Sequence, residues 1–317
     1  MKIVEISSQI QRIPLETPFV TALRRVENVA FVRVRVKNDL KALSYGEAPA
    51  TKAITGEDLV SITSAVEQNK ALFYNLSPEE ARDLLDTLEI GSSAKAALDM
   101  AFCGFEKPPF DFKNKTTKLQ TAITISFNST DEMLQDAYKA RRNNHKILKL
   151  KFSSDINHAI KTTVKIHEKI EDAKLLIDAN QAWNLEDAKR YLDAMSDGEV
   201  ELVEQPLGAK DIQGMKLLTH YSSIPIVADE SCFTLADVKN VLESLSADII
   251  NIKLMKCGGL IKAQEILEYC REKKVAVMMG SMLEGPVSIA YAWSLVEQYG
   301  DVIKYVDLDS PLLYKSD

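Results

Sequence analysis

The chain has 317 residues, of which 46% are hydrophobic and 27% charged, so it can form one large domain or two smaller ones. Its 39 Lys and Arg residues face 46 Asp and Glu residues, and the net charge of -7 gives no reason to expect nucleic acid or a membrane surface as partner. Charges interrupt the first residues, and no uncharged run reaches the ~18 residues of a membrane helix. Together with four cysteines that lack any CxxC spacing, this predicts a cytoplasmic protein.

The first third of the chain is expected to form an α+β unit. Residues 2–15 and 28–37 alternate between apolar and polar side chains, which predicts half-buried antiparallel strands. Residues 55–104 change to a helical pattern, in which Ser77, Pro78 and Glu80 are typical of a helix start. A stretch rich in Pro and Lys at 106–118 has no periodicity and marks the predicted boundary, so we expect one domain at 1–115 and another at 116–317.

The second part of the chain alternates short apolar runs with amphipathic segments. Repeated strand–helix units with fully apolar strands are typical of a parallel sheet, and eight of them predict a closed barrel. An open, doubly wound sheet is the alternative, which the absence of G-x-G-x-x-G after any strand weakly disfavours. The predicted strands lie within residues 119–127, 146–152, 173–179, 200–205, 224–230, 247–254, 275–282 and 303–309.

Charged residues stand at the carboxyl ends of these predicted strands. In a barrel such ends form one mouth, where active sites are built from several strands at once. A single charge there is explained more simply as the point where polar residues begin, but charges of both signs after seven strands favour a functional site. The residues are Lys149, Lys151, Asp178, Glu204, Asp229, Glu230, Lys253, Glu284, Asp307 and Asp309.

Three carboxylates from neighbouring strands indicate a metal site. Asp178, Glu204 and Asp229 can converge on a hard cation that accepts oxygen ligands and leaves positions open for a substrate. The four histidines lie away from the strand ends, which argues against zinc and against a histidine base. Mg²⁺ is therefore the expected cofactor.

Lysines flank this predicted metal site. Lys149 and Lys151 point to one side of a strand, and Lys253 comes from the opposite side of the mouth, so one amine can lie on each face of a substrate carbon. Loss of a proton next to a carboxylate creates a dianionic enediolate, which a divalent cation stabilises. Lys149 and the metal would lower the pKa of a neighbouring lysine base, and return of a proton from the opposite face would invert the carbon.

The motifs KLKF, LLIDANQAW, ELVEQP, VADES and DIINIKLMKCGG resemble, in order, the barrel-strand motifs of the enolase superfamily, in its muconate lactonizing enzyme subgroup. The resemblance covers most of the chain. It implies an α/β fold, a modified TIM barrel (β/α)7β preceded by an α+β capping domain. It also implies Mg²⁺ held by Asp178, Glu204 and Asp229, acid/base roles for Lys151 and Lys253, and an auxiliary role for Lys149.

Two further segments resemble the dipeptide epimerases, most closely the L-Ala-D/L-Glu epimerases. DLDSPLL carries a D-x-D pair, which implies that Asp307 and Asp309 hold the free ammonium group of a substrate. TPFVTALRRVENV resembles a loop of the cap, and Arg24 matches an arginine that receives the side-chain carboxylate of glutamate, with Arg25 as the alternative. Thr124, Ser281 and Glu284, within or just after the first and seventh predicted strands, complete the predicted substrate-binding residues.

These observations predict an isomerase that epimerises the carboxyl-terminal residue of a dipeptide, with L-Ala-L-Glu as the expected substrate. An N-acylamino acid racemase, an o-succinylbenzoate synthase or a cycloisomerase would use the same lysines and metal, but would leave Asp307 and Asp309 without an ammonium partner. A non-catalytic metal-dependent binding protein is disfavoured, because paired lysines beside a cation are costly without a function. The expected partner is a small-molecule dipeptide, and assembly into a homo-oligomer is compatible with the sequence.

Overall fold

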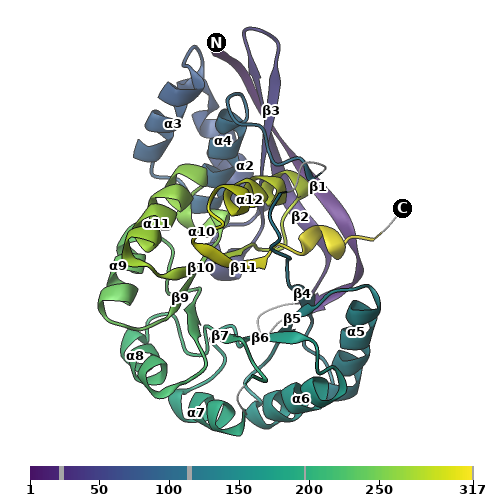
Figure 1. The fold of residues 1–317 in the computed structure, drawn as a ribbon. Helices are drawn as coiled ribbons and strands as arrows, with labels where there is room; N and C mark the ends of the chain where they lie inside the picture. Colours follow the sequence, from purple (N-terminus) through teal and green to yellow (C-terminus); the bar gives the residue numbers. More distant parts are fainter. Residues whose placement is uncertain (21–24, 113–115, 196–197, 316–317) are drawn as a thin grey trace.

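The chain begins with a three-stranded antiparallel sheet (Figure 1). The structure, a computed structural model, describes residues 1–20, 25–112, 116–195 and 198–315. On the middle strand Val32, Val34 and Val36 are fully buried, while the residues between them are partly exposed, which is the alternation predicted for a half-buried strand. The strands are β1 (Ile3–Val20), β2 (Arg25–Asn38) and β3 (Leu43–Pro49), in that order in the sheet.

Helices cover the inner face of this sheet. Ser77 and Glu80 form the predicted reciprocal capping box at the start of α3, with Pro78 in its first turn. Helix α4 has ten buried residues among its twelve, because it packs between β3 on one side and barrel helices on the other. The elements are α1 (Lys52–Thr55), α2 (Leu59–Asn69), the 3-10 helix η1 (Lys70–Phe73), α3 (Pro78–Thr87) and α4 (Ser92–Cys103).

The second sheet has eight strands, and every neighbouring pair is parallel. Its two edges meet where the amide of Ala122 donates to the carbonyl of Val306 at 2.8 Å, so the sheet closes into the predicted barrel. The strands are shorter than the apolar runs of the sequence. They are β4 (Ile123–Ile125), β5 (Ile147–Lys151), β6 (Lys174–Asp178), β7 (Leu202–Glu204), β8 (Ile226–Ala228), β9 (Ile249–Ile252), β10 (Ala276–Gly280) and β11 (Ile303–Asp307).

Seven helices connect successive barrel strands and surround them, which is the (β/α)7β arrangement (Figure 1). No helix within the described parts of the chain is both long and apolar enough to cross a membrane. The connecting helices are α5 (Thr130–Arg142), α6 (Ile156–Lys169), α7 (Leu185–Ala194), α8 (Ile212–Tyr221), α9 (Leu235–Glu243), α11 (Leu260–Lys273) and α12 (Pro286–Gln298). A single extra turn, α10 (Leu254–Cys257), precedes α11, and a 3-10 turn, η3 (Ser310–Leu312), follows β11.

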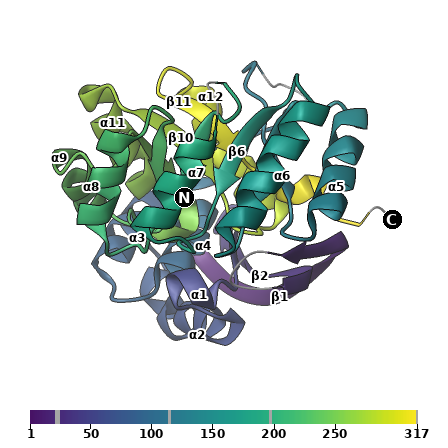
Figure 2. The same cartoon turned by 90° about the horizontal axis from the view of Figure 1, so that it is seen from below.

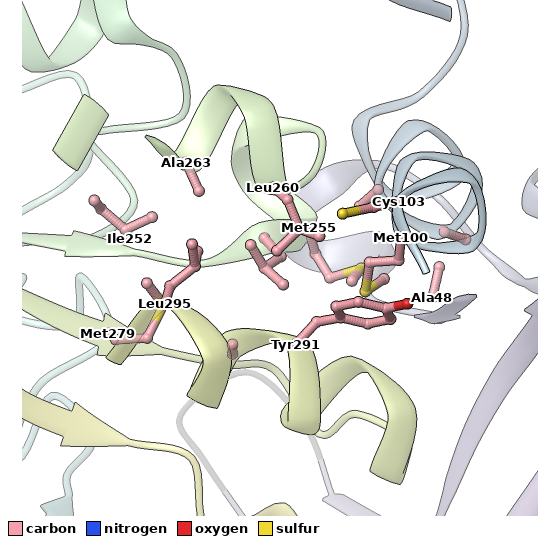
Figure 3. Packing of buried hydrophobic residues seen from close by; sticks show 14 of the residues in the cluster. Ala48, Met100, Cys103, Ile252, Met255, Leu260, Ala263, Met279, Tyr291 and Leu295 are labelled. Carbon is pink, nitrogen blue, oxygen red and sulfur yellow. The ribbon is translucent and has the colours of Figure 1, made fainter. Parts of the chain in front are cut away.

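The amino-terminal elements lie together on one side of the barrel (Figure 2). One hydrophobic cluster is continuous between them and the barrel: it contains Met100 of α4 together with Met255 of α10, Leu260 of α11 and Leu295 of α12. Figure 3 shows Met255 and Leu260 beside Met100 at the junction of the two parts, with Leu295 further into the barrel. The cap and this half of the barrel therefore share a core.

Candidate active site

The barrel interior has an apolar layer and, above it, a charged layer. Leu176, Leu202 and Val227 belong to a small cluster contributed by several strands, which fills the bottom of the barrel. Two residues further along each strand come Asp178, Glu204 and Asp229, which face the same interior because side chains alternate along a strand. The predicted position of these charges, at the carboxyl ends of the strands, is thereby explained.

The three carboxylates are buried and held in place by their neighbours. Asp178 and Glu204 pair in register on adjacent strands, and both side chains are fully buried. The Asp178 Oδ1 atom accepts from the Asn180 amide at 2.9 Å, and the Glu204 Oε1 atom accepts from the Asn251 side chain at 2.9 Å. Asp178, Glu204 and Asp229 lie at the ends of three neighbouring strands, β6, β7 and β8.

Three lysines reach the same carboxylates. The Lys149 Nζ atom lies 3.0 Å from Asp178 Oδ2 and 2.7 Å from Glu204 Oε2. The Lys151 Nζ atom lies 2.5 Å from the same Asp178 oxygen, and Lys253 Nζ lies 2.7 Å from Asp229 Oδ2. Since β5 and β9 are four strands apart in a closed eight-stranded barrel, Lys151 and Lys253 approach from opposite sides.

A fourth lysine in the site was missed at the level of sequence. Lys256 is 2% exposed, and its Nζ atom donates to Asp229 Oδ1 at 2.6 Å and to the carbonyl of Asn251 at 2.9 Å. The signal was present in KLMK, because a second lysine three residues after Lys253 returns to the same side once the intervening residues form a helical turn. Lys256 therefore holds the oxygen of Asp229 that Lys253 does not contact.

The electrostatics reflect an excess of buried carboxylates. Burial, and then the neighbouring Asp178, raise the pKa of Glu204 to about 7. Burial, and then Asp229, raise the pKa of Glu230 to about 8. Burial disfavours the ammonium form of Lys149 and Lys253 and so acts to lower their pKa values. The surrounding carboxylates outweigh burial, so both pKa values are raised overall.

This donor set fits a hard divalent cation. Among the residues that the structure describes, no three His, Cys, Asp or Glu side chains are arranged as a metal-binding group. Ammonium groups contact the oxygens of Asp178 and Asp229. The cluster nevertheless holds more carboxylates than lysines, and a divalent cation would add positive charge beside them. Glu204 Oε2 and Glu230 Oε2 are buried without a hydrogen bond, and Glu204 meets Lys149 only as an ion pair. The buried acids Asp178, Glu204, Asp229, Glu230, Asp307 and Asp309 outnumber the buried lysines Lys149, Lys151, Lys253 and Lys256.

A cavity opens above these charges. Lys151 and Lys253 line it, as do the predicted substrate-binding residues Thr124, Ser281, Asp307 and Asp309, together with Phe19, Ile54 and Leu283. Asp307 Oδ2 lies 2.6 Å from Lys149 Nζ, while Asp307 Oδ1 is buried without a hydrogen bond. Asp309 Oδ2 accepts from the Thr124 amide at 2.7 Å.

Glu284 and Arg25 lie away from the lining of this cavity. Glu284 does not line this cavity: its carboxylate accepts from the Met282 amide at 2.8 Å and from the Ser288 hydroxyl, so it braces the loop after β10 instead of facing a ligand. Arg24 lies outside the described residues. Arg25, the alternative, lines a different cavity beside α5.

Backbone strain accumulates next to the carboxylates. Asn180 and Gln181, just after Asp178, have φ values of 44° and 69°, and Gln205, just after Glu204, has a φ of 38°. Non-glycine residues rarely adopt this left-handed region, and where they do the surrounding structure must hold them. Here the Gln205 side chain accepts from the amides of Asp229 and Ser231, which links the strained turn to the next carboxylate.

Comparison with known proteins agrees with the fold. Residues 132–309, more than half of the chain, match the enolase C-terminal domain-like family. The chain therefore belongs to this family.

More specific relatives are epimerases. The chain is 50% identical to the L-amino acid-D/L-Glu epimerase of Sulfurimonas denitrificans, over 99% of this chain and 95% of that protein. It is 37% identical to the L-Ala-D/L-Glu epimerase of Bacillus subtilis, over 100% and 90% of the two chains. Both relatives extend over the cap as well as the barrel.

Solved structures similar to this chain are also epimerases. A substrate-liganded complex of the Bacillus subtilis L-Ala-D/L-Glu epimerase superposes with a TM-score of 0.91 at 36% identity, covering 100% of this chain and 92% of that one. A dipeptide epimerase of Enterococcus faecalis, complexed with Mg and the dipeptide L-Leu-L-Tyr, superposes with a TM-score of 0.93 at 30% identity, with the same coverage. The predicted family resemblance is thus confirmed.

Proposed function

We propose that this chain is a Mg²⁺-dependent dipeptide epimerase, an isomerase that inverts the α-carbon of the carboxyl-terminal residue of a dipeptide. The observation that carries this proposal is the placement of Lys151 and Lys253 on opposite sides of one cavity, above three buried carboxylates. Relatives that cover nearly the whole chain and are named epimerases support it.

Each charged side chain has a task in this proposal. Asp178, Glu204 and Asp229 would hold the cation, which when bound would supply positive charge to the substrate carboxylate as the α-proton leaves. One of Lys151 and Lys253 removes that proton from its face of the carbon, and the other delivers a proton to the opposite face. Lys149 contacts the same Asp178 oxygen as Lys151, so it places a second positive charge beside that lysine.

The free amino terminus of the substrate has a partner in the cavity. Asp307 retains one oxygen without a hydrogen bond, and Asp309 lies beside it, so together they offer negative charge to an ammonium group. Burial, and then the neighbouring Asp307, raise the pKa of Asp309 to about 6. A dipeptide with a free amino terminus fits this arrangement better than an N-acylated amino acid does, and L-Ala-L-Glu is the proposed substrate.

Isotope exchange tests the reaction and the substrate together. A dipeptide library, incubated with the enzyme and Mg²⁺ in D2O, is expected to yield inverted products that carry one deuterium at the α-carbon of the carboxyl-terminal residue. N-acetylation of a substrate, or Asp309→Asn, should raise KM because each removes one charged partner. Turnover of N-acetylated amino acids as fast as free dipeptides would instead identify a racemase of the same family.

We place the enzyme in the cytoplasm, which four free cysteines support, because such thiols persist in a reducing compartment. Association into a homo-oligomer stays a prediction. Sedimentation of the purified protein measures it directly.

A further inference from the structure

A buried carboxylate of the cap contacts the barrel at the start of α11, in the segment that follows Lys253. Asp99, on α4, is 3% exposed and takes no part in the proposed chemistry. Its Oδ2 atom accepts from the Leu260 amide at 2.5 Å, and its Oδ1 atom accepts from Arg82 Nε at 3.0 Å. Leu260 is the first residue of α11, a helix without a side-chain cap of its own, so the capping domain supplies the carboxylate at its amino terminus.

The backbone is shaped for this contact. A side chain at Gly259 would place its Cβ atom 2.6 Å from Asp99 Oδ2, so only glycine allows the carboxylate to come this close. Gly258 and Gly259 have φ values of 94° and 122°, a region that other residues rarely adopt. The two glycines thus present the start of α11 to Asp99.

The segment held by Asp99 begins at Lys253. Lys253 is the residue before the turn α10, and its carbonyl accepts from the amides of Lys256 and Cys257. The other end of the turn closes where the amides of Gly258 and Gly259 both donate to the carbonyl of Leu254. One rigid turn therefore joins Lys253 to the Asp99 contact, and the same turn carries Lys256 to Asp229.

Packing makes the junction tight on the side of the cap. Met255 of α10 is fully buried in the cluster that contains Met100, one residue after Asp99, and Figure 3 shows Met255 and Leu260 beside Met100 and Cys103. Arg82 on α3 fixes the other oxygen of Asp99, so the carboxylate is oriented from within the cap. The capping domain thus sets the orientation of Asp99, and the barrel receives its carboxylate at the start of α11.

We propose that Asp99 is a positioning residue through which the capping domain holds the turn α10, and thereby sets the place of the Lys253 amine in the active site. The inference rests on the proposed function, because it assigns Lys253 to one face of the substrate carbon. It predicts that loss of the Asp99 contact impairs the reaction on the Lys253 face and leaves the Lys151 face in place.

Partitioning of the deprotonated substrate tests this prediction. In D2O, each epimer of the dipeptide gives two labelled products: the starting epimer with deuterium, after return of a deuteron from the same lysine, and the inverted epimer, after delivery of a deuteron from the opposite lysine. Asp99→Asn is expected to lower kcat about 10-fold or more, because small displacements of a catalytic group have large effects. From the epimer whose α-hydrogen faces Lys151 the ratio of exchange to inversion should rise, and from the other epimer it should fall.

The matched control is Glu57, a carboxylate that caps a helix wholly inside the cap. It accepts from the amides of Ser93 and Ala94 at the start of α4, just as Asp99 accepts from Leu260. Glu57→Gln should reduce stability without changing the ratio for either epimer. The proposal would be overturned if Asp99→Asn left the ratio of exchange to inversion unchanged for both epimers. It would also be overturned if Glu57→Gln changed these ratios in the same way as Asp99→Asn.

Amide hydrogen exchange gives a reading that does not depend on turnover. In the metal-free enzyme, Asp99→Asn should increase exchange in residues 254–262, whereas Glu57→Gln should increase it only near residues 92–95. Unchanged exchange at 254–262 overturns the proposal even if the wild-type enzyme inverts no dipeptide, an outcome that would separately contradict the proposed function. If Asp99→Asn does not fold, Arg82→Gln, which removes only one partner of Asp99, should produce the same changes at smaller size.

Discussion

Lys151 and Lys253 have different partners although they are proposed to do mirror-image chemistry. Lys151 contacts only one oxygen of Asp178, which Lys149 shares. Lys253 contacts Asp229, whose second oxygen is held by Lys256. Lys151 thus has Lys149 of the same strand as its neighbour. Lys253 has Lys256, one helical turn further along the chain, as its neighbour.

Replacement of either lysine is expected to abolish inversion. Lys151→Ala and Lys253→Ala each remove one proton carrier, so kcat for epimerisation should fall at least about 10³-fold, within the range found for general acid–base groups. Chiral chromatography of the dipeptide measures the loss, and circular dichroism checks that the fold is retained. Full epimerisation by either variant would contradict a mechanism with two bases.

Lys256 is expected to act on the metal site without touching the substrate. Lys256→Met keeps the length of the side chain but removes the donor to Asp229, so the Mg²⁺ concentration for half-maximal activity should rise about 10- to 100-fold, as for other residues that orient metal ligands. Lys262→Met is the matched control, since Lys262 lies on α11 and pairs with Asp86 at the surface. An unchanged Mg²⁺ requirement for Lys256→Met would show that Asp229 needs no such brace.

At the scale of elements, Glu80 at the start of α3 contributes to the stability of the fold in a way that depends on pH. Hydrogen bonds from Lys2 and then from the Ser77 amide lower the pKa of Glu80 from 4.5 to about 2. A carboxyl with a lowered pKa stabilises the folded state above its unfolded pKa, and this stabilisation is lost as the pH falls toward the folded value. Glu80→Gln should therefore lower the melting temperature slightly at pH 7, since the pair is exposed, and the difference should shrink between about pH 5 and pH 3.

Calorimetry at several pH values measures this difference. Lys2→Met should reproduce most of it, because Lys2 is the partner that responds to the charge of Glu80. A difference that grows as the pH falls would contradict the assignment.

The barrel strands and the capping box were predictable because they depend on local pattern: largely apolar runs of six to nine residues, and a Ser three residues before a Glu. The metal and lysine candidates were predictable because alternation fixes which residues face the interior. Lys256 was missed, and the hydrogen bonds of Glu284 were not foreseen, for a different reason. Whether a charged side chain reaches a neighbour or a ligand depends on turns whose direction only the folded chain sets, as α10 and the loop after β10 show.

At the scale of the whole molecule, the excess of buried carboxylates links metal binding to stability. Removal of Mg²⁺ by EDTA should abolish epimerisation and lower the melting temperature, because a ligand that binds only the folded state stabilises it. At 100-fold excess over its dissociation constant, Mg²⁺ should add about 2.7 kcal/mol to the free energy of unfolding.

Differential scanning calorimetry with and without Mg²⁺ measures the stabilisation, and Asp229→Asn should reduce it. Undiminished turnover in excess EDTA would contradict a metal-dependent reaction. An equal stabilisation of Asp229→Asn would mean that the cation binds elsewhere.

The shared core of cap and barrel has a consequence for engineering. Attempts to change specificity by exchanging whole caps between relatives would join two half-cores that never packed together, because Met100 and Cys103 on one side meet Met255 and Tyr291 on the other. A chimaera of this kind should express poorly unless the facing residues of α10 and α12 are exchanged with the cap. Substitution of a single cavity residue outside this cluster, such as Phe19, leaves the shared core intact and is the safer route to new substrates.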